Sequence, residues 1–140
     1  MDTKEKKRLL NSYRRLIAQI KALSEALEYT GALIHSPVYD GMPHTSRNSD
    51  LSDLTIKRDE YEREMQDLID RKLDTLRRID DLIEAMDNEK EKEVLTRRYI
   101  EIKSFEQVAI DMGKSYRQTM RLHRLAISHF GEVKERGNDG

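Results

Sequence analysis

Residues 104–130 read SFEQVAIDMGKSYRQTMRLHRLAISHF. This stretch predicts two short helices joined by a tight turn. Ser104 is a suitable N-cap, and Gln107, three residues later, can complete a capping box for the first helix. Gly113 is expected to end this helix, because glycine adopts the left-handed conformation of a sharp helix end without a steric penalty.

A second helix start follows directly. Ser115 and Gln118 repeat the capping-box spacing and predict a helix over residues 115–130. Two helix starts around one helix stop are typical of the helix-turn-helix, whose second helix enters the major groove of DNA. Small Ala109 fits a close approach of the two helices, while Thr119 stands where a β-branched apolar residue is more usual. Inward apolar contacts are expected from Val108, Met112, Leu122, Leu125 and Ala126.

The second helix of this motif is expected to face nucleic acid. Between Lys114 and Phe130 every charged residue is basic, although the chain has a formal net charge of −1. Such a local positive bias indicates a surface directed at phosphates. The predicted DNA-binding residues are Lys114, Ser115, Tyr116, Arg117, Gln118, Arg121 and Arg124.

These side chains suit different parts of a duplex. Gln118 favours adenine and Arg117 favours guanine, because each can form two parallel hydrogen bonds with its base. Lys114 and Arg124 are expected to bind phosphates. Arg121 is placed to reach either a base or a phosphate.

Three segments carry a resemblance to a known family. They are the run Glu93-Val-Leu-Thr-Arg-Arg-Tyr-Ile100, the run Ser104-Phe-Glu-Gln-Val-Ala and the turn Met112-Gly-Lys-Ser. Together they resemble region 4 of bacterial sigma factors and its phage relatives over roughly residues 89–130. The resemblance implies a role in transcriptional control, without the promoter-melting region of a complete sigma factor.

The front of the chain resembles a second group of proteins. The segments Tyr39-Asp-Gly-Met-Pro43 and Ser49-Asp-Leu-Ser-Asp53 are similar to small phage and prophage proteins of uncharacterised role. Their layout, a helical front half before a sigma-region-4-like end, is similar to that of the ArpU-type regulators of late phage genes. The resemblance implies a phage-encoded regulator.

Composition favours long helices over a thick globular core. The chain of 140 residues is 38% charged and 36% hydrophobic, with no Trp and two Phe. No window approaches the ~20 apolar residues of a membrane span, and the amino terminus lacks a signal-peptide apolar region. We therefore expect a soluble, cytoplasmic protein with no membrane partner. The lack of cysteine excludes disulfides and thiolate metal sites.

The first half of the chain predicts a helical hairpin. Apolar residues at alternating steps of four and three predict a helix from about Thr3 to Leu33. Residues 35–49 hold both prolines and an Asp-Gly turn signal, and predict a reversing loop. A second helix is expected from about Asp50 to Met86. The heptad positions of the first helix are Leu9, Tyr13, Leu16, Ile20, Leu23 and Leu27.

Two helices packed along one seam leave neighbouring apolar residues partly exposed. A homodimer that buries them in a four-helix bundle is the expected remedy, and it would present two recognition helices to one duplex. The residues concerned are Leu10, Ile17, Ile69, Leu73 and Ile83.

A change in charge marks the predicted domain boundary. Residues 1–93 hold 17 Lys and Arg against 21 Asp and Glu, whereas residues 94–136 hold 9 against 5. The predicted domains are a dimerising hairpin over residues 1–87, a helix-turn-helix domain over residues 88–130 and a flexible tail over residues 131–140.

The first helix of the C-terminal domain is expected over residues 89–102, with Asn88 as its cap. Arg97 and Arg98 on this helix either add phosphate contacts or form a solvated face. The small core is expected from Val94, Leu95, Tyr99, Ile102, Phe105 and Phe130. The predicted fold class is therefore all-α: a long antiparallel helical hairpin, or coiled coil, followed by a three-helix helix-turn-helix domain.

No chemical site accompanies these helices. His35, Asp40 and His44 share one loop, but their spacing matches no metal-ligand pattern, and His123 and His129 do not share a helix face. No nucleophile beside a base and no glycine-rich phosphate loop stands out. We therefore expect no enzymatic activity, no metal and no cofactor.

The sequence favours a DNA-binding transcriptional regulator over two alternatives. One is an adaptor that contacts RNA polymerase without binding DNA. The other is a phage packaging component of the small-terminase type, which also joins a helix-turn-helix to a coiled coil but assembles into rings. A subunit count above four would favour the packaging component.

Overall fold

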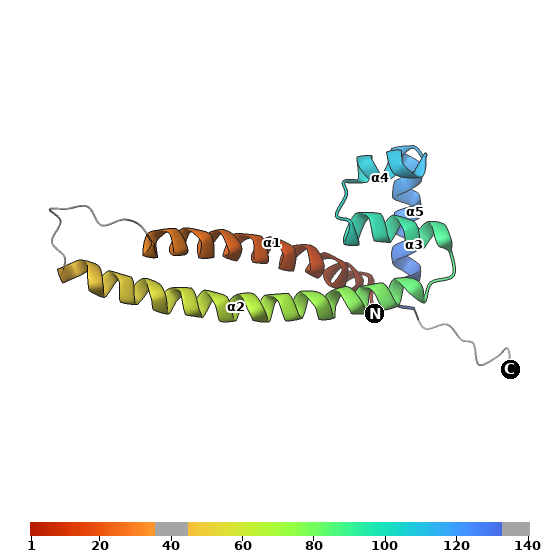
Figure 1. Ribbon diagram of the computed structural model, residues 1–140. Helices are drawn as coiled ribbons and strands as arrows, with labels where there is room; N and C mark the ends of the chain where they lie inside the picture. The colour runs from red at the N-terminus through yellow and green to blue at the C-terminus, as the bar shows by residue number, and fades with distance from the viewer. Residues whose placement is uncertain (36–44, 133–140) are drawn as a thin grey trace. The chain divides into compact units, whose positions relative to one another are not determined.

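The computed structural model describes residues 1–35 and 45–132, and it confirms the all-α class. No strand occurs among these residues (Figure 1). The predicted turn at Asp40 and the tail from residue 133 onward lie outside the described residues. The elements are α1 (Thr3–Ile34), α2 (Thr45–Glu84), α3 (Glu89–Leu95), a π-helical turn η1 (Thr96–Ile100), α4 (Phe105–Met112) and α5 (Tyr116–His129).

The chain forms two compact units, and both long helices contribute to each. The first unit joins residues 1–15 to the chain from residue 73 onward, and the second comprises residues 16–72. The start of α1 and the end of α2 therefore belong to the same unit as the C-terminal helices. The boundary predicted from the sequence, between residues 87 and 88, falls inside this first unit.

The second unit is a pair of helices held by the predicted heptad positions. Leu16 and Leu23 of α1 and Leu68 of α2 form its buried apolar core. Burial of such apolar side chains supplies most of the stability of paired amphipathic helices. The partly buried residues packed against them are Ile20, Tyr61 and Met65.

The second long helix begins earlier than predicted. It starts at Thr45 instead of Asp50, so the end of the predicted loop at residues 45–49 is helical. The physical reason is that Pro43 excludes helix only at and before its own position. The residues after it include neither glycine nor proline, so nothing prevents an earlier start.

The core of the first unit draws on helices from both ends of the chain. Leu10 of α1 and Ile79 and Ile83 of α2 are fully buried, as are Leu95 of α3 and Phe130. The expectation that Leu10 and Ile83 would be partly exposed is therefore wrong. A two-helix seam would expose them, but here α1 and α2 share a core with α3 and α5.

The helix after α2 is shorter and less regular than predicted. Asn88 caps it as expected, since its Oδ1 accepts hydrogen bonds from the backbone N–H groups of Lys90 and Glu91. After Leu95, however, the backbone widens into the π-helical turn η1, and Ile102 has a φ of 56°. The prediction of a regular helix over residues 89–102 is therefore wrong. Positive φ is unusual for a β-branched residue and ends the helix before α4.

The turn between α4 and α5 closes by a Schellman motif at Gly113. The N–H of Gly113 donates to the carbonyl of Ile110 at 3.1 Å, and the N–H of Lys114 donates to the carbonyl of Ala109 at 3.0 Å. Gly113 has a φ of 64°, in the left-handed region. α5 then packs against both α3 and α4 (Figure 1). The predicted helix stop is thus confirmed in its detail.

The cap at the start of α4 differs from the prediction. The Oγ of Ser104 accepts a hydrogen bond from the N–H of Gln107 at 3.2 Å, as expected. The side chain of Gln107, however, donates to Asp111 at 2.8 Å instead of completing the capping box. In a capping box the amide oxygen of Gln107 would accept from the N–H of Ser104, whereas here the amide nitrogen makes a charge-assisted hydrogen bond to a carboxylate one turn later.

Two glycine-to-alanine changes are expected to have opposite effects on stability. At Gly113 a Cβ would meet no atom within 4 Å, so the cost of Gly113→Ala is the left-handed backbone alone, about 1 kcal/mol. Gly31 lies in α1 with open space around it, and Gly31→Ala is expected to raise the free energy of unfolding by up to about 1 kcal/mol. Urea unfolding measures the change in the free energy of unfolding of each variant. Equal changes in the two variants would contradict the requirement for a left-handed residue at Gly113.

Candidate nucleic-acid interface

The start of α5 is fixed by a complete capping box. The Oγ of Ser115 accepts from the N–H of Gln118 at 3.1 Å, and the Oε1 of Gln118 accepts from the N–H of Ser115 at 3.0 Å. Bidentate recognition of adenine by Gln118 would need this same oxygen. Both residues are thus engaged in holding the helix end, and an adenine contact by Gln118 would have to share this oxygen with the box.

One face of α5 lies in the core. Thr119, His123, Ala126 and Ile127 are buried, and the hydroxyl of Thr119 donates to the carbonyl of Ser115 at 2.9 Å. That bond satisfies the polar atom at the position where an apolar residue was expected. Of the predicted inward residues, Val108 and Ala126 are buried, and Met112 and Leu122 are half-buried.

Leu125 does not point inward, contrary to the prediction. Its side chain is 53% exposed. The physical reason is its position four residues after Arg121, which places it on the outer face of α5. Leu125 lines a shallow hollow there with Arg121, Arg124 and Ser128.

The outer face of α5 carries a row of arginines. Arg117, Arg121 and Arg124 are exposed, and their spacing of four and three residues places them on one side of the helix. No hydrogen bond or ion pair within the described part of the chain engages any of the three guanidinium groups. Tyr116 is half exposed at the start of this face, and Lys114 is half-buried beside it. We call Arg117, Arg121 and Arg124 the arginine face.

His123 ties α5 to the helices behind it. Its Nε2 lies 2.7 Å from the hydroxyl oxygen of buried Tyr99, and its ring meets Phe105 edge-on at 4.9 Å between centroids. Burial, with smaller contributions from the positive charges of Lys7 and Arg98, lowers the pKa of His123 from 6.5 to about 4. The ring is therefore neutral near pH 7 and acts as a core residue.

Arg97 is engaged inside the fold. Its guanidinium pairs with Glu93 at 2.9 Å and with Asp111 at 3.4 Å. Asp111 also binds Lys103 at 2.7 Å, and the hydrogen bonds from Lys103 and Gln107 lower the pKa of this carboxyl. These contacts link η1 to α4 and occupy Arg97.

Arg98 is likewise occupied. It donates to the carbonyl of Lys103 at 2.9 Å, and its guanidinium carbon lies 4.3 Å from the centre of the Phe105 ring. A cation over an aromatic face is attracted by the ring quadrupole. The arginines of η1 thus hold the fold, in contrast to those of α5.

Sequence reasoning missed the part played by Lys6. This side chain is buried, and its Nζ donates to the carbonyl of Ser128 at 2.9 Å and pairs with Glu132 at 2.5 Å. Its hydrogen bond lowers the pKa of Glu132. Lys6 therefore anchors the C-terminal end of α5 to α1. One sequence feature could have revealed this role. Lys6 lies seven residues before Tyr13, at a heptad position where an apolar, buried residue is expected.

The described residues hold neither a metal-ligand cluster nor a membrane-spanning helix. Within residues 1–35 and 45–132, no three His, Asp or Glu side chains gather in a way that could hold a metal ion. His35 is described, whereas Asp40 and His44 lie outside those residues. Across the same ranges, none of the helices combines the length and the apolar character needed to cross a bilayer.

Comparison with known proteins places the chain in a family. A family model described as "Protein of unknown function (DUF1492)" matches residues 35–131. No curated protein and no solved structure matches the chain. The matching description mentions neither sigma region 4 nor ArpU-type regulators, so that resemblance stays a prediction. Because the match covers more than half of the sequence, the chain belongs to the DUF1492 family.

Proposed function

We propose that the protein is a DNA-binding transcriptional regulator that contacts duplex DNA through the outer face of α5. The observation that carries this proposal is the arginine face, whose three guanidinium groups are exposed. α5 contains no acidic residue, so nothing on this helix opposes the approach of phosphates. The short turn before it, closed by Gly113 between α4 and α5, supports the helix-turn-helix interpretation.

The surrounding charges support the same surface. Asp111 is neutralised by Lys103 and Arg97, and Glu132 is neutralised by Lys6. Asp111 and Glu132 therefore have cationic partners, whereas the arginines of α5 have none within the described residues. Such unpaired basic groups on one exposed face are the electrostatic footprint of phosphate binding.

Further parts of the proposal follow from the sequence. The resemblance to sigma region 4 and to ArpU-type proteins supports a phage-encoded regulator without enzymatic activity, working in the cytoplasm beside RNA polymerase. Exposed Tyr29, Leu33 and Ile56 on the second unit support a homodimer formed through that unit. Light scattering at micromolar concentration tests the dimer, and a monomer would contradict it.

One observation favours a second function, in which the C-terminal helices bind a protein. Ile110 of α4 is 72% exposed, and Leu125 of α5 is also exposed. Exposed apolar side chains on a small domain are typical of protein interfaces. The adaptor that contacts RNA polymerase without DNA is therefore the alternative.

A salt series on random duplex DNA distinguishes the two functions. On random duplex, where no particular base is read, Lys114, Arg117, Arg121 and Arg124 are all expected to contact phosphates. The affinity of the full chain is therefore expected to fall about 100-fold between ~50 and ~200 mM salt. Fluorescence anisotropy measures this. Absence of binding at the lowest salt would contradict the proposal and favour the adaptor.

A further inference from the structure

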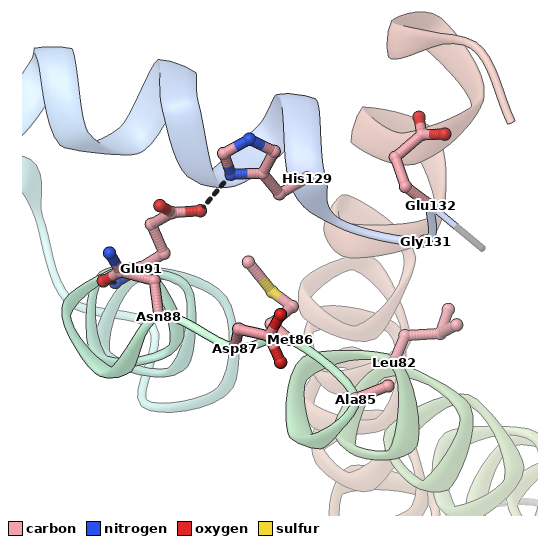
Figure 2. A pocket seen from close by; sticks show the side chains of 9 residues that line it. All are labelled: Leu82, Ala85, Met86, Asp87, Asn88, Glu91, His129, Gly131 and Glu132. Carbon is pink, nitrogen blue, oxygen red and sulfur yellow. Dashed lines mark hydrogen bonds and ion pairs between the residues drawn. The ribbon is translucent and has the colours of Figure 1, made fainter. Parts of the chain in front are cut away.

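A pocket of about 410 Å³ lies in the first unit, where the ends of three helices meet (Figure 2). α2 ends at Glu84, α3 begins at Glu89, and α5 ends at His129. Its volume falls within the ~300–1,000 Å³ of pockets that bind small molecules. The pocket is separate from the arginine face and has no part in the proposed function.

One side of the pocket is apolar. Leu82 of α2 lines it with Ala85 and Met86, which directly follow the end of α2. Figure 2 shows Leu82 and Ala85 at one end and Glu91 at the other, with Met86 and Asp87 between them and His129 above Met86. A surface of this kind binds the apolar body of a ligand by removing it from water.

The pocket is also lined by acidic residues. Asp87, Glu91 and Glu132 line it with three carboxyl groups. Glu91 is only 5% exposed, and its Oε1 lies 2.5 Å from the Nδ1 of His129. A carboxylate has two oxygens with two acceptor sites each. Within the described residues the second oxygen of Glu91 receives no donor, so it can accept one from a ligand.

The helix ends contribute partial charges of both signs to the same space. α2 and α5 end at the pocket with partial negative charges, whereas α3 begins there with a partial positive charge. Two of the carboxyl groups already have partners, because Lys6 pairs with Glu132 and His129 pairs with Glu91. The feature left to bind a cation is therefore the second oxygen of Glu91, beside an apolar lining.

We propose that this pocket binds a small organic amine. The apolar body of the amine lies on Leu82, Ala85 and Met86, and its ammonium group donates to Glu91. A neutral molecule of the same shape gains only the apolar contact, and an anion is repelled by the carboxylates. The charge of the ligand therefore decides its binding.

A matched pair of probes tests the ligand class. Phenethylamine and 2-phenylethanol share one skeleton and differ in charge. Titration of the ¹⁵N-labelled full chain with phenethylamine is expected to shift the amide signals of residues 85–91 and 129–132, with a Kd of about 1 mM. The alcohol is expected to bind at least about tenfold more weakly. Equal affinity for the two probes, or no shifts in these residues, would overturn the proposal.

Two variants locate the site. Glu91→Gln removes the charge and is expected to weaken phenethylamine binding about tenfold. Ala85→Phe fills the apolar side from an exposed position and is expected to abolish binding even if Glu91→Gln proves poorly folded. Ala18→Phe makes the same change on exposed α1, away from the pocket, and should leave the Kd unchanged. Unaltered binding by Ala85→Phe would overturn the assignment. No step uses DNA, so failure here leaves the proposed function standing.

Discussion

Replacing Arg117 and Arg121 together by alanine is expected to weaken binding to duplex DNA by about 10- to 100-fold at ~0.1 M salt. Both side chains are exposed on the outer face of α5, and no ion pair in the described chain would be broken by their removal. The fold should therefore survive, because the buried face of α5 is untouched. Fluorescence anisotropy with a random duplex measures the loss.

A matched variant controls for net charge. Arg77→Ala/Arg78→Ala removes two equally exposed arginines from α2. It lowers the net charge of the protein by the same amount, and we expect less than about a twofold effect on DNA affinity. Equal losses in the two double variants would show that general charge, and not the arginine face, governs binding.

Acidification from pH 6.5 to 4.5 is expected to lower the free energy of unfolding by about 2 kcal/mol through His123 alone. Burial lowers the pKa of this ring to about 4 in the folded chain, against 6.5 for an exposed histidine. The unfolded chain therefore binds a proton in this range and the folded chain does not. The stabilisation is complete above pH 6.5 and is lost as the pH falls toward 4.

A His123→Gln variant isolates this effect. The amide can still hydrogen-bond to the hydroxyl of Tyr99, but it does not titrate. The variant is expected to be less stable at pH 7, with a flatter pH dependence between 6.5 and 4.5. Lowered carboxyl pKa values, as at Asp111 and Glu132, add a loss of stability that begins only at about pH 5 and is common to both proteins. Urea unfolding at several pH values measures the free energy of unfolding of both proteins. The same pH dependence in the variant and the unmodified chain would contradict the role given to His123.

Local signals predicted the parts of the fold that depend on neighbouring residues. Ser115, Gln118 and Gly113 form their cap and turn with groups no more than five residues away. Such contacts are encoded in short windows of sequence. The exposed arginines of α5 follow from the same periodicity once the buried face is known.

Features that depend on distant segments could not be predicted in this way. Lys6 bonds to Ser128 and Glu132 from the other end of the sequence. Leu10 and Ile83 are buried because the C-terminal helices share their core. Periodicity identifies an apolar stripe but not the element that covers it, so these residues were expected to be exposed.

The engagement of Arg97 and Arg98 was left open by the sequence for a related reason. Glu93 is within reach on the same helix, but Asp111 and Phe105 approach only after the widened turn at η1. Since that turn departs from regular helix, no helical periodicity reveals it. The structure thus distinguishes Arg97 and Arg98, which hold the fold, from the exposed arginine face of α5, although all of these residues look alike in sequence.

The salt dependence of DNA affinity in the Arg117→Ala/Arg121→Ala variant tests the arginine face most directly. Each phosphate contact contributes about 0.9 to the slope of log affinity against log salt. If both arginines bind phosphates, the slope of the variant is expected to be about 1.8 smaller in magnitude than that of the unmodified chain. The same slope in both proteins would show that these arginines do not contact the DNA backbone, and would contradict the account.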